Sequence, residues 1–209
     1  MSNKKLINSP LIISSRLQFH RVINKHEIHR ICEIGVFEGT YSAYLNKAFS
    51  PEQLWLIDSW IGVITSGDKD GKNVKSFKDN YLYLQVCKKF INDRNIHVLR
   101  YKSDILRIFP NNYFDLVYID GDHSYDVVLH DLNICYKKVR CNGWILGHDY
   151  KPNLSIWKPQ KDFPTFGSEI KQAVDDFCFQ KGLQISMFAM DGRVSFGIIN
   201  KKFWLDNYI

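Results

Sequence analysis

The 209-residue sequence predicts an α/β fold in which helices cover both faces of a mostly parallel β-sheet. Short apolar stretches alternate with helical stretches, as is typical of strands joined by crossover helices. Residues 114–120 (FDLVYID) are almost wholly apolar, as expected of a strand that is covered on both faces. Near the end of the chain, residues 184–190 and 193–200 flank Asp191 and Gly192 and predict a closing antiparallel hairpin.

The other elements are placed by the same alternation and by residues that favour helix ends. We expect further strands over residues 30–36, 53–58, 96–101 and 143–148. We expect helices over residues 40–49, 77–92, 125–139 and 168–180. Pro51 favours the end of the first helix, and Ser168 and Gly182 suit the two ends of the last.

Length and composition indicate a single globular domain over residues 1–209, led by an arm or helix over residues 1–28. No apolar stretch is long enough to span a membrane, and the first residues lack the pattern of a cleaved signal. The five cysteines are odd in number and form no CxxC pair, which argues against a disulfide framework and a cysteine zinc site. We therefore expect a cytoplasmic protein without a membrane partner.

The chain is basic, with a formal net charge of +6 and a pI of about 9.0. Such a balance can indicate a nucleic-acid or other anionic partner. The lysines and arginines are scattered, however, and form no long run. A solvated surface is the simpler interpretation, and a functional basic face is the alternative.

Two segments, residues 60–76 and 150–167, interrupt the alternation of strands and helices. Both follow predicted strands at the edge where open α/β sheets bind ligands. We expect them either to form lids over a substrate or to be plain surface loops.

A glycine-punctuated turn follows the first predicted parallel strand, in residues 32–40 (CEIGVFEGT). Its spacing is E-x-G-x-x-x-G, which differs from the G-x-G-x-x-G of pyrophosphate-binding turns. Glu33 would repel a pyrophosphate but attract the ammonium and sulfonium of S-adenosylmethionine. Glu33, Gly35 and Gly39 are therefore predicted to line a cofactor turn, with a purely structural turn as the alternative.

Acidic and hydroxyl residues follow the next two strands. Asp58 ends a strand about 20 residues after the turn, where a carboxylate can bind both ribose hydroxyls of a nucleotide. A helix cap or a solvated loop acid is the alternative for Asp58. Ser103 and Asp104 lie just beyond the third predicted parallel strand and could reach the adenine or the ribose.

Carboxylates and imidazoles gather after two strands that we expect to be neighbours. Asp120, Asp122 and His123 follow the apolar strand, while His148 and Asp149 end the next one. Neighbouring strands lie about 5 Å apart, so a predicted metal site combines Asp120, His148 and Asp149 around a divalent cation. A hydrogen-bonded Asp/His network without metal is the alternative.

These segments together resemble a known family. The runs EIGVFEGTYSAYL, LIDSW, FDLVYIDGDHSYDVVLHDL and GWILGHDY are similar to those of class I S-adenosylmethionine-dependent methyltransferases. Within that class the chain resembles the group with the IDGDHSY signature, which includes sugar O-methyltransferases of macrolide and aminocoumarin biosynthesis. The resemblance covers roughly residues 30–150. It implies the Rossmann-like class I methyltransferase fold, an α/β fold with a seven-stranded, mostly parallel sheet, an antiparallel last strand and helices on both faces.

The resemblance also implies roles for individual residues. Asp120 and Asp149 would be magnesium ligands, with Asp120 also beside the cofactor. Asp122 would be the general base, and His123 is a second candidate for that role. His148 stands where the sugar enzymes have an acidic ligand, which weakens the case for Mg²⁺ because imidazole is a softer donor.

The expected activity is transfer of a methyl group from S-adenosylmethionine to a hydroxyl of a small-molecule acceptor such as a sugar or phenol, with Mg²⁺ or another divalent cation as a second cofactor. Nucleic-acid methylation is the enzymatic alternative, but the chain lacks the Asp/Asn-Pro-Pro-aromatic turn and the Pro-Cys pair of such enzymes. A non-catalytic S-adenosylmethionine-binding module is the other alternative. The glycine spacing and Glu33 disfavour a nicotinamide-dependent oxidoreductase. A homo-oligomer is compatible with the sequence, which does not fix the assembly.

Overall fold

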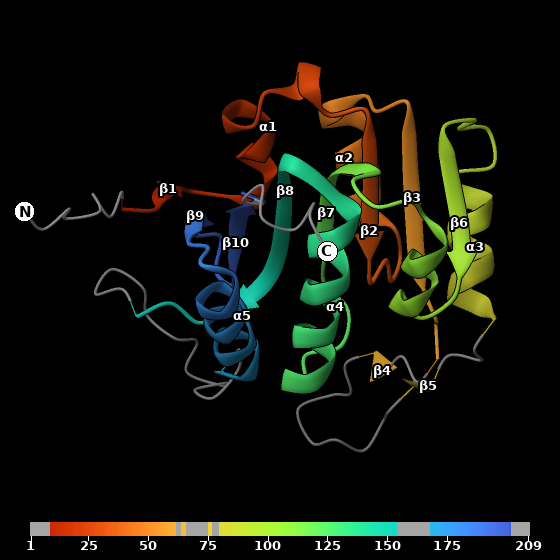
Figure 1. Ribbon diagram of the computed structural model, residues 1–209. Helices are drawn as coiled ribbons and strands as arrows, with labels where there is room; N and C mark the ends of the chain where they lie inside the picture. The colour runs from red at the N-terminus through yellow and green to blue at the C-terminus, as the bar shows by residue number, and fades with distance from the viewer. Residues whose placement is uncertain (1–8, 62–63, 66–74, 77–79, 154–167, 202–209) are drawn as a thin grey trace, which may run out of the picture.

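The computed structural model describes residues 9–61, 64–65, 75–76, 80–153 and 168–201. Within these ranges one eight-stranded sheet forms the centre, with the strand order β1-β9-β10-β8-β7-β2-β3-β6 (Figure 1). Its strands are β1 (Leu11–Ile13), β2 (Arg30–Ile34), β3 (Gln53–Asp58), β6 (Ile96–Arg100), β7 (Phe114–Ile119), β8 (Val139–Tyr150), β9 (Ile185–Ala189) and β10 (Val194–Ile199). A separate two-stranded ladder joins β4 (Ile64–Thr65) and β5 (Lys75–Ser76).

The pairing confirms a mostly parallel sheet with one antiparallel strand near its end. β2 pairs in parallel with both β3 and β7, and β7 pairs in parallel with β8. β10 is antiparallel to both β8 and β9, so the predicted closing hairpin is present. The predicted number of seven strands is one too few, because β1 adds to the edge beside β9. This short strand lies in the segment that we expected to be an arm or helix.

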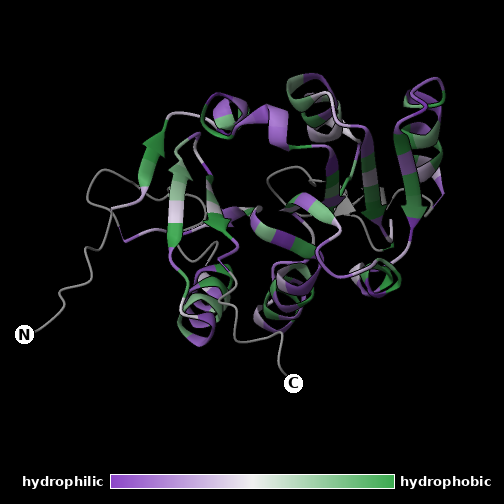
Figure 2. Ribbon diagram, turned by 45° about the horizontal axis from the view of Figure 1, so that its top comes forward, coloured by the Kyte–Doolittle hydropathy of each residue, from purple (hydrophilic) through white to green (hydrophobic). Residues whose placement is uncertain are grey.

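Helices cover both faces of the sheet, as expected. They are α1 (Phe19–Val22), α2 (Thr40–Phe49), α3 (Tyr81–Lys89), α4 (Tyr125–Lys138) and α5 (Ser168–Lys181). On one face α4 and α5 bury residues such as Leu132 and Phe177, and on the other α1, α2 and α3 bury Phe19, Leu45 and Val86. Figure 2 shows largely apolar strands beside helices in which hydrophilic and hydrophobic residues alternate. Burial of apolar surface on both sides holds the strand ends in register.

Most predicted bounds agree with the structure, and the differences have local causes. β2 ends at Ile34 because Gly35 takes a left-handed φ of +85°, which a strand cannot continue. β8 begins at Val139, earlier than the expected start at residue 143, because α4 runs directly into it. The described part of the predicted 77–92 helix is shorter, since α3 spans Tyr81–Lys89.

The parallel strands end at one edge of the sheet, toward the bottom of Figure 1. The two segments that we predicted as lids, residues 60–76 and 150–167, each begin at this edge with a buried residue. Trp60 is 1% exposed, and Tyr150 lies buried within β8 with its hydroxyl donating to Asp175 at 2.8 Å. Residues 154–167 and most of 62–79 lie outside the described residues, so the lids stay predictions. Across the described residues, no helix combines the length and apolar composition needed to cross a membrane.

Candidate active site

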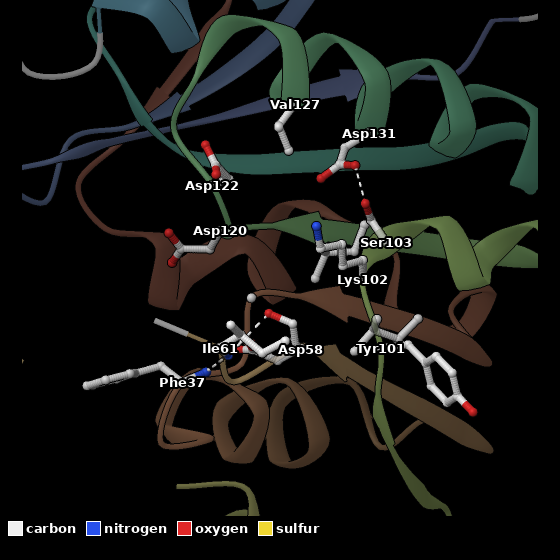
Figure 3. Close-up of a pocket in the computed structure, with 15 residues that line it drawn as sticks. Phe37, Asp58, Ile61, Tyr101, Lys102, Ser103, Asp120, Asp122, Val127 and Asp131 are labelled. Carbon is white, nitrogen blue, oxygen red and sulfur yellow. Dashed lines mark hydrogen bonds between the residues drawn. The ribbon is translucent and has the colours of Figure 1, made fainter. Parts of the chain in front are cut away.

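A cavity of about 400 Å³ opens at the carboxyl edge of the sheet, between the ends of β2, β3, β6 and β7 (Figure 3). Its lining includes four predicted cofactor residues and one predicted catalytic residue: Gly35, Asp58, Ser103, Asp120 and Asp122. Figure 3 shows Asp120 and Asp122 at one end, with Ser103 and Asp131 at the other. A carboxylate pair thus lies across the cavity from a hydroxyl–carboxylate pair.

The turn after β2 leaves space for a ligand because Gly35 has no side chain. A Cβ built on Gly35 would lie 2.1 Å from the carbonyl oxygen of Asp120, so no other residue fits without backbone movement. Gly39 has a left-handed φ of +67° and precedes the first residue of α2. A Cβ there would lie 2.8 Å from the Phe90 ring, and Gly39 does not line the cavity. Gly39 therefore serves the packing of the turn rather than its open face.

Asp58 fastens this turn to the end of β3. Its Oδ2 accepts hydrogen bonds from the backbone N–H groups of Val36 at 2.9 Å and Phe37 at 3.0 Å, and Oδ1 accepts from the N–H of Trp60 at 2.7 Å. A carboxylate has about four acceptor positions, so about one remains for a ligand. The Trp60 indole N–H donates to the Phe37 carbonyl at 2.9 Å. Phe37 and Trp60 both have positive φ, so these bonds hold a strained loop beside the cavity.

Glu33 does not line the cavity. Its side chain is buried, and it accepts a short hydrogen bond from the Ser42 hydroxyl of α2. Burial raises the pKa of Glu33 to about 8, so this carboxyl is mostly protonated at neutral pH in the absence of a ligand. Glu33 would therefore not touch a cofactor in the cavity. The attraction that we expected between its carboxylate and a cationic cofactor would have to act at a distance.

The predicted adenine end has one residue that sequence reasoning missed. Ser103 lines the cavity and donates to Asp131 of α4, which is buried and also lines it (Figure 3). Burial raises the pKa of Asp131 to about 6. Asp104 lies outside the cavity lining, where it pairs with Arg107 at 3.0 Å and His130 at 3.1 Å. Only the fold brings the interior of α4 to this site, so no local pattern marked Asp131.

The carboxylates and imidazoles at the ends of β7 and β8 meet as the sequence predicted, with one exchange. Asp120, His123 and Asp149 each offer a ligand atom, and these atoms lie within 4.8 Å of one another. His148 was the predicted third ligand, but its Nδ1 lies 3.1 Å from Asp149 and 3.6 Å from Asp120 as an ion-pair partner. Burial lowers the pKa of His148, but its contacts with both carboxylates outweigh burial and raise it to about 9.

Asp149 has two features of a functional residue. It is a non-glycine residue at φ +60°, a conformation that costs roughly 1–3 kcal/mol. Its buried Oδ1 lacks a properly aligned hydrogen bond, although the His148 ring lies near it. Oδ2 lies 3.3 Å from His123 and 3.7 Å from Arg193. Two carboxylates, an imidazole and an under-coordinated buried oxygen form a donor set that fits a divalent cation.

Asp122 lines the cavity and is ionised. Its Oδ1 accepts from the backbone N–H of Ser124 at 2.8 Å, just before α4. Hydrogen bonds from Ser124 lower the pKa of Asp122. Asp122 can therefore accept a proton from a bound hydroxyl, although its lowered pKa makes it a weak base.

Arg16, from the segment before α1, also reaches this edge and was missed by sequence reasoning. Its guanidinium Nη1 donates to the Tyr118 hydroxyl at 3.0 Å and lies 3.4 Å from Asp120 Oδ2. A single arginine in an otherwise unpatterned segment gives no sequence signal. Pairing of β1 with β9 carries Arg16 to the ends of the central strands.

Several solved structures share this fold. The N-methyltransferase NodS of Bradyrhizobium japonicum aligns with a TM-score of 0.57 and 11% identity over 90% of this chain and 95% of that one. An O-methyltransferase family protein of Burkholderia thailandensis aligns with a TM-score of 0.58 and 12% identity over 90% of this chain and 55% of that one. Aeropyrum pernix fibrillarin, crystallised with natively bound S-adenosyl-L-methionine, aligns with a TM-score of 0.51 and 13% identity over 82% of this chain and 66% of that one. At these identities the likeness establishes the fold alone.

A sequence relative comes from a giant virus. The uncharacterized protein R132 of Acanthamoeba polyphaga mimivirus is 31% identical over 134 residues, which are 61% of this chain and 53% of that protein. The match thus spans about half the length of this curated relative. A family model described as a methyltransferase domain matches residues 32–150, which are more than half of the chain and run from within β2 to the end of β8. The chain therefore belongs to this methyltransferase domain family.

Proposed function

We propose that this chain transfers the methyl group of S-adenosylmethionine to a hydroxyl oxygen of a small-molecule acceptor, such as a sugar or a phenol. The observation that carries this proposal is the continuity of the site. The cavity that fits the cofactor ends at Asp120 and Asp122, and these adjoin the His123, His148 and Asp149 cluster. Bound in the cavity, S-adenosylmethionine would supply an activated methyl group on a sulfonium.

The residues of the cavity suit the parts of this cofactor. Gly35 leaves the turn open, and Asp58 keeps about one acceptor position for a ribose hydroxyl. Ser103 and Asp131 lie at the opposite end from Asp120, where they can accept hydrogen bonds from an adenine or donate hydrogen bonds to it. The chain thus contributes mainly alignment, since holding reactants in line lowers much of the barrier to a displacement.

The acceptor hydroxyl would lie between Asp122 and the cluster formed by Asp120, His123 and Asp149. Asp122 would take its proton, and His123 is the alternative base. We propose that Asp120, His123 and Asp149 hold a divalent cation, which would lower the pKa of a coordinated hydroxyl. His148, charged at neutral pH, would then fix the two carboxylates from the buried side.

The test is a transfer assay with methyl-labelled S-adenosylmethionine, Mg²⁺ and separate panels of monosaccharides, catechols and RNA. Labelled sugar or phenol is expected from the wild-type chain. Asp122→Asn should lose about a hundredfold or more of the rate, as expected for a general base. Asp126→Asn, which removes an exposed carboxylate four residues along, is the matched control and should keep full activity. Labelled RNA without labelled small acceptors would contradict the proposal and favour nucleic-acid methylation.

A further inference from the structure

We propose that Arg16 binds the carboxylate of the methionine moiety of S-adenosylmethionine, while Asp120 binds its ammonium group. This inference rests on the proposed function, since it assigns one end of the same cofactor site. It makes the segment before α1 part of the binding site, although the matched family region begins only at residue 32.

The guanidinium of Arg16 lies beside Asp120, a residue of the cavity lining, and contacts three groups there. Nη1 donates to the Tyr118 hydroxyl at 3.0 Å and lies 3.4 Å from Asp120 Oδ2, and the guanidinium carbon lies 4.9 Å from the centre of the Tyr41 ring. Asp120 lines the cavity, and its carbonyl oxygen is the atom beside Gly35. The positive group therefore pairs with the residue whose backbone packs against the glycine turn, which we assign to the amino-acid end of the cofactor.

Arg16 keeps donors for a further ligand. A guanidinium has five N–H donors. Nη1 serves both Tyr118 and Asp120, and Nε lies 3.9 Å from Asp191 Oδ2, so Nη2 is the nitrogen that no contact among the described residues uses. The Arg16 side chain is 27% exposed and that of Asp120 is 24% exposed, so solvent reaches both partners of this ion pair. A planar guanidinium matches a carboxylate in a two-bond fork, which favours this anion as the ligand.

The backbone around Arg16 is also fixed, so the side chain is preorganised. Asp191, in the turn between β9 and β10, accepts from the Arg16 backbone N–H at 3.0 Å and from the Ser15 hydroxyl at 3.1 Å. A short 3₁₀ helix, Arg16–Gln18, follows and leads into the fully buried Phe19. Less conformational freedom is then lost when a ligand binds.

The charges of the site complement a zwitterion. The amino-acid end of the cofactor carries an ammonium and a carboxylate on one carbon, and the site carries Asp120 beside Arg16. Each also has a second charged neighbour, since Asp120 lies 3.6 Å from His148 and Arg16 lies 3.9 Å from Asp191. Binding of an ammonium beside Asp120 and of a carboxylate beside Arg16 adds one charge of each sign, so the balance of charge in this partly buried place is kept.

The test compares three probes by calorimetric titration: S-adenosylmethionine, its decarboxylated form, and methylthioadenosine, which lacks the whole amino-acid part. Arg16→Gln should weaken the affinity for S-adenosylmethionine by about ten- to a hundredfold, the usual range for loss of a charge-assisted hydrogen bond. It should leave the other two probes within about twofold of wild type. Arg21→Gln, which removes an exposed arginine of α1, is the matched control and should change none of the affinities.

Arg16→Lys keeps the positive charge but loses the planar two-bond geometry of the guanidinium. This variant should fold, and its affinity for S-adenosylmethionine should fall by less than that of Arg16→Gln, with no change for the two probes that lack the carboxylate. Unchanged S-adenosylmethionine affinity in both Arg16 variants would overturn the inference and leave the proposed function standing. Equal weakening of all three probes would also overturn it, because Arg16 would then only support the fold. A wild-type chain that binds none of the probes would overturn the proposed function itself.

Discussion

The Asp58 carboxylate accepts a hydrogen bond from the backbone N–H of Phe37 at 3.0 Å, and this bond ties the end of β3 to the turn after β2. Val36 and Trp60 donate to the same carboxylate. One acid therefore both shapes the glycine turn and faces the cavity. Loss of its charge should disturb loop geometry and cofactor binding together.

Asp58→Asn tests this double role. The amide can replace only one of the two accepting oxygens, so either Trp60 or the Val36–Phe37 pair meets a donor instead of an acceptor. We expect a loss of about 1–3 kcal/mol in the free energy of unfolding and at least a tenfold weaker affinity for S-adenosylhomocysteine. Urea unfolding and calorimetry measure the two effects. Glu38→Gln, an exposed acid in the same turn, is the control, and equal effects from both variants would contradict the assignment.

Gly35→Ala tests the close approach of the glycine turn to β7. The added Cβ would lie 2.1 Å from the Asp120 carbonyl oxygen at a φ of +85°. We expect a loss of more than about 2 kcal/mol in unfolding free energy, from backbone strain together with the clash. Gly182→Ala is the matched control, because Gly182 has φ +63° with nothing within 4 Å, so only the strain remains. Similar losses in the two variants would show that the clash is relieved at no cost.

Glu33→Gln tests the burial of Glu33. In the folded chain its pKa is raised by burial from 4.5 to about 8, so between these values the folded state holds a proton that the unfolded state has lost. The free energy of unfolding should therefore fall as pH rises through this window, by at most about 1.4 kcal/mol per pH unit from this group. Glutamine carries no proton to lose, so the variant should show a shallower slope.

Urea unfolding of both proteins from pH 5 to pH 8 measures this slope, and the difference between them cancels the contributions of other groups. His148 and Asp131 titrate in overlapping windows but are common to both proteins. Identical slopes would show that Glu33 is already ionised in the folded chain.

Asp149→Asn tests the divalent cation. Asparagine tolerates the left-handed φ of +60° found at this position, so the fold should be kept while one carboxylate ligand is lost. Titration of Mn²⁺ alone, followed by its paramagnetic resonance, should show binding to the wild-type chain that is weakened about tenfold or more in the variant. Chelation should lower the transfer rate. Equal Mn²⁺ binding by both proteins would assign the cluster to a hydrogen-bonded network.

Much of the fold follows from local patterns, and the exceptions depend on distant partners. The predicted helix over residues 40–49 is α2 and the predicted strand over residues 53–58 is β3, because apolar spacing and Pro51 mark their bounds. β1 has three residues and no readable period, and its pairing with β9 alone makes it a strand. No local sequence pattern in β1 or in β9 indicates that the two strands pair.

The site shows the same division. Asp58, Asp120 and Asp122 follow strands, and strand ends could be read from the sequence, so their gathering at the cavity could be expected. Arg16 and Asp131 come from a leading segment and a helix interior, and tertiary packing alone brings them there. The burial of Glu33 against Ser42, outside the cavity lining, was equally hidden, because both faces of β2 are covered by helices.

The most direct test of the account is calorimetric titration of the wild-type chain with S-adenosylhomocysteine. The account predicts saturable binding at one site per chain, with a Kd well below 1 mM, and competition by S-adenosylmethionine. A folded chain that takes up neither compound at concentrations of about 1 mM would contradict it.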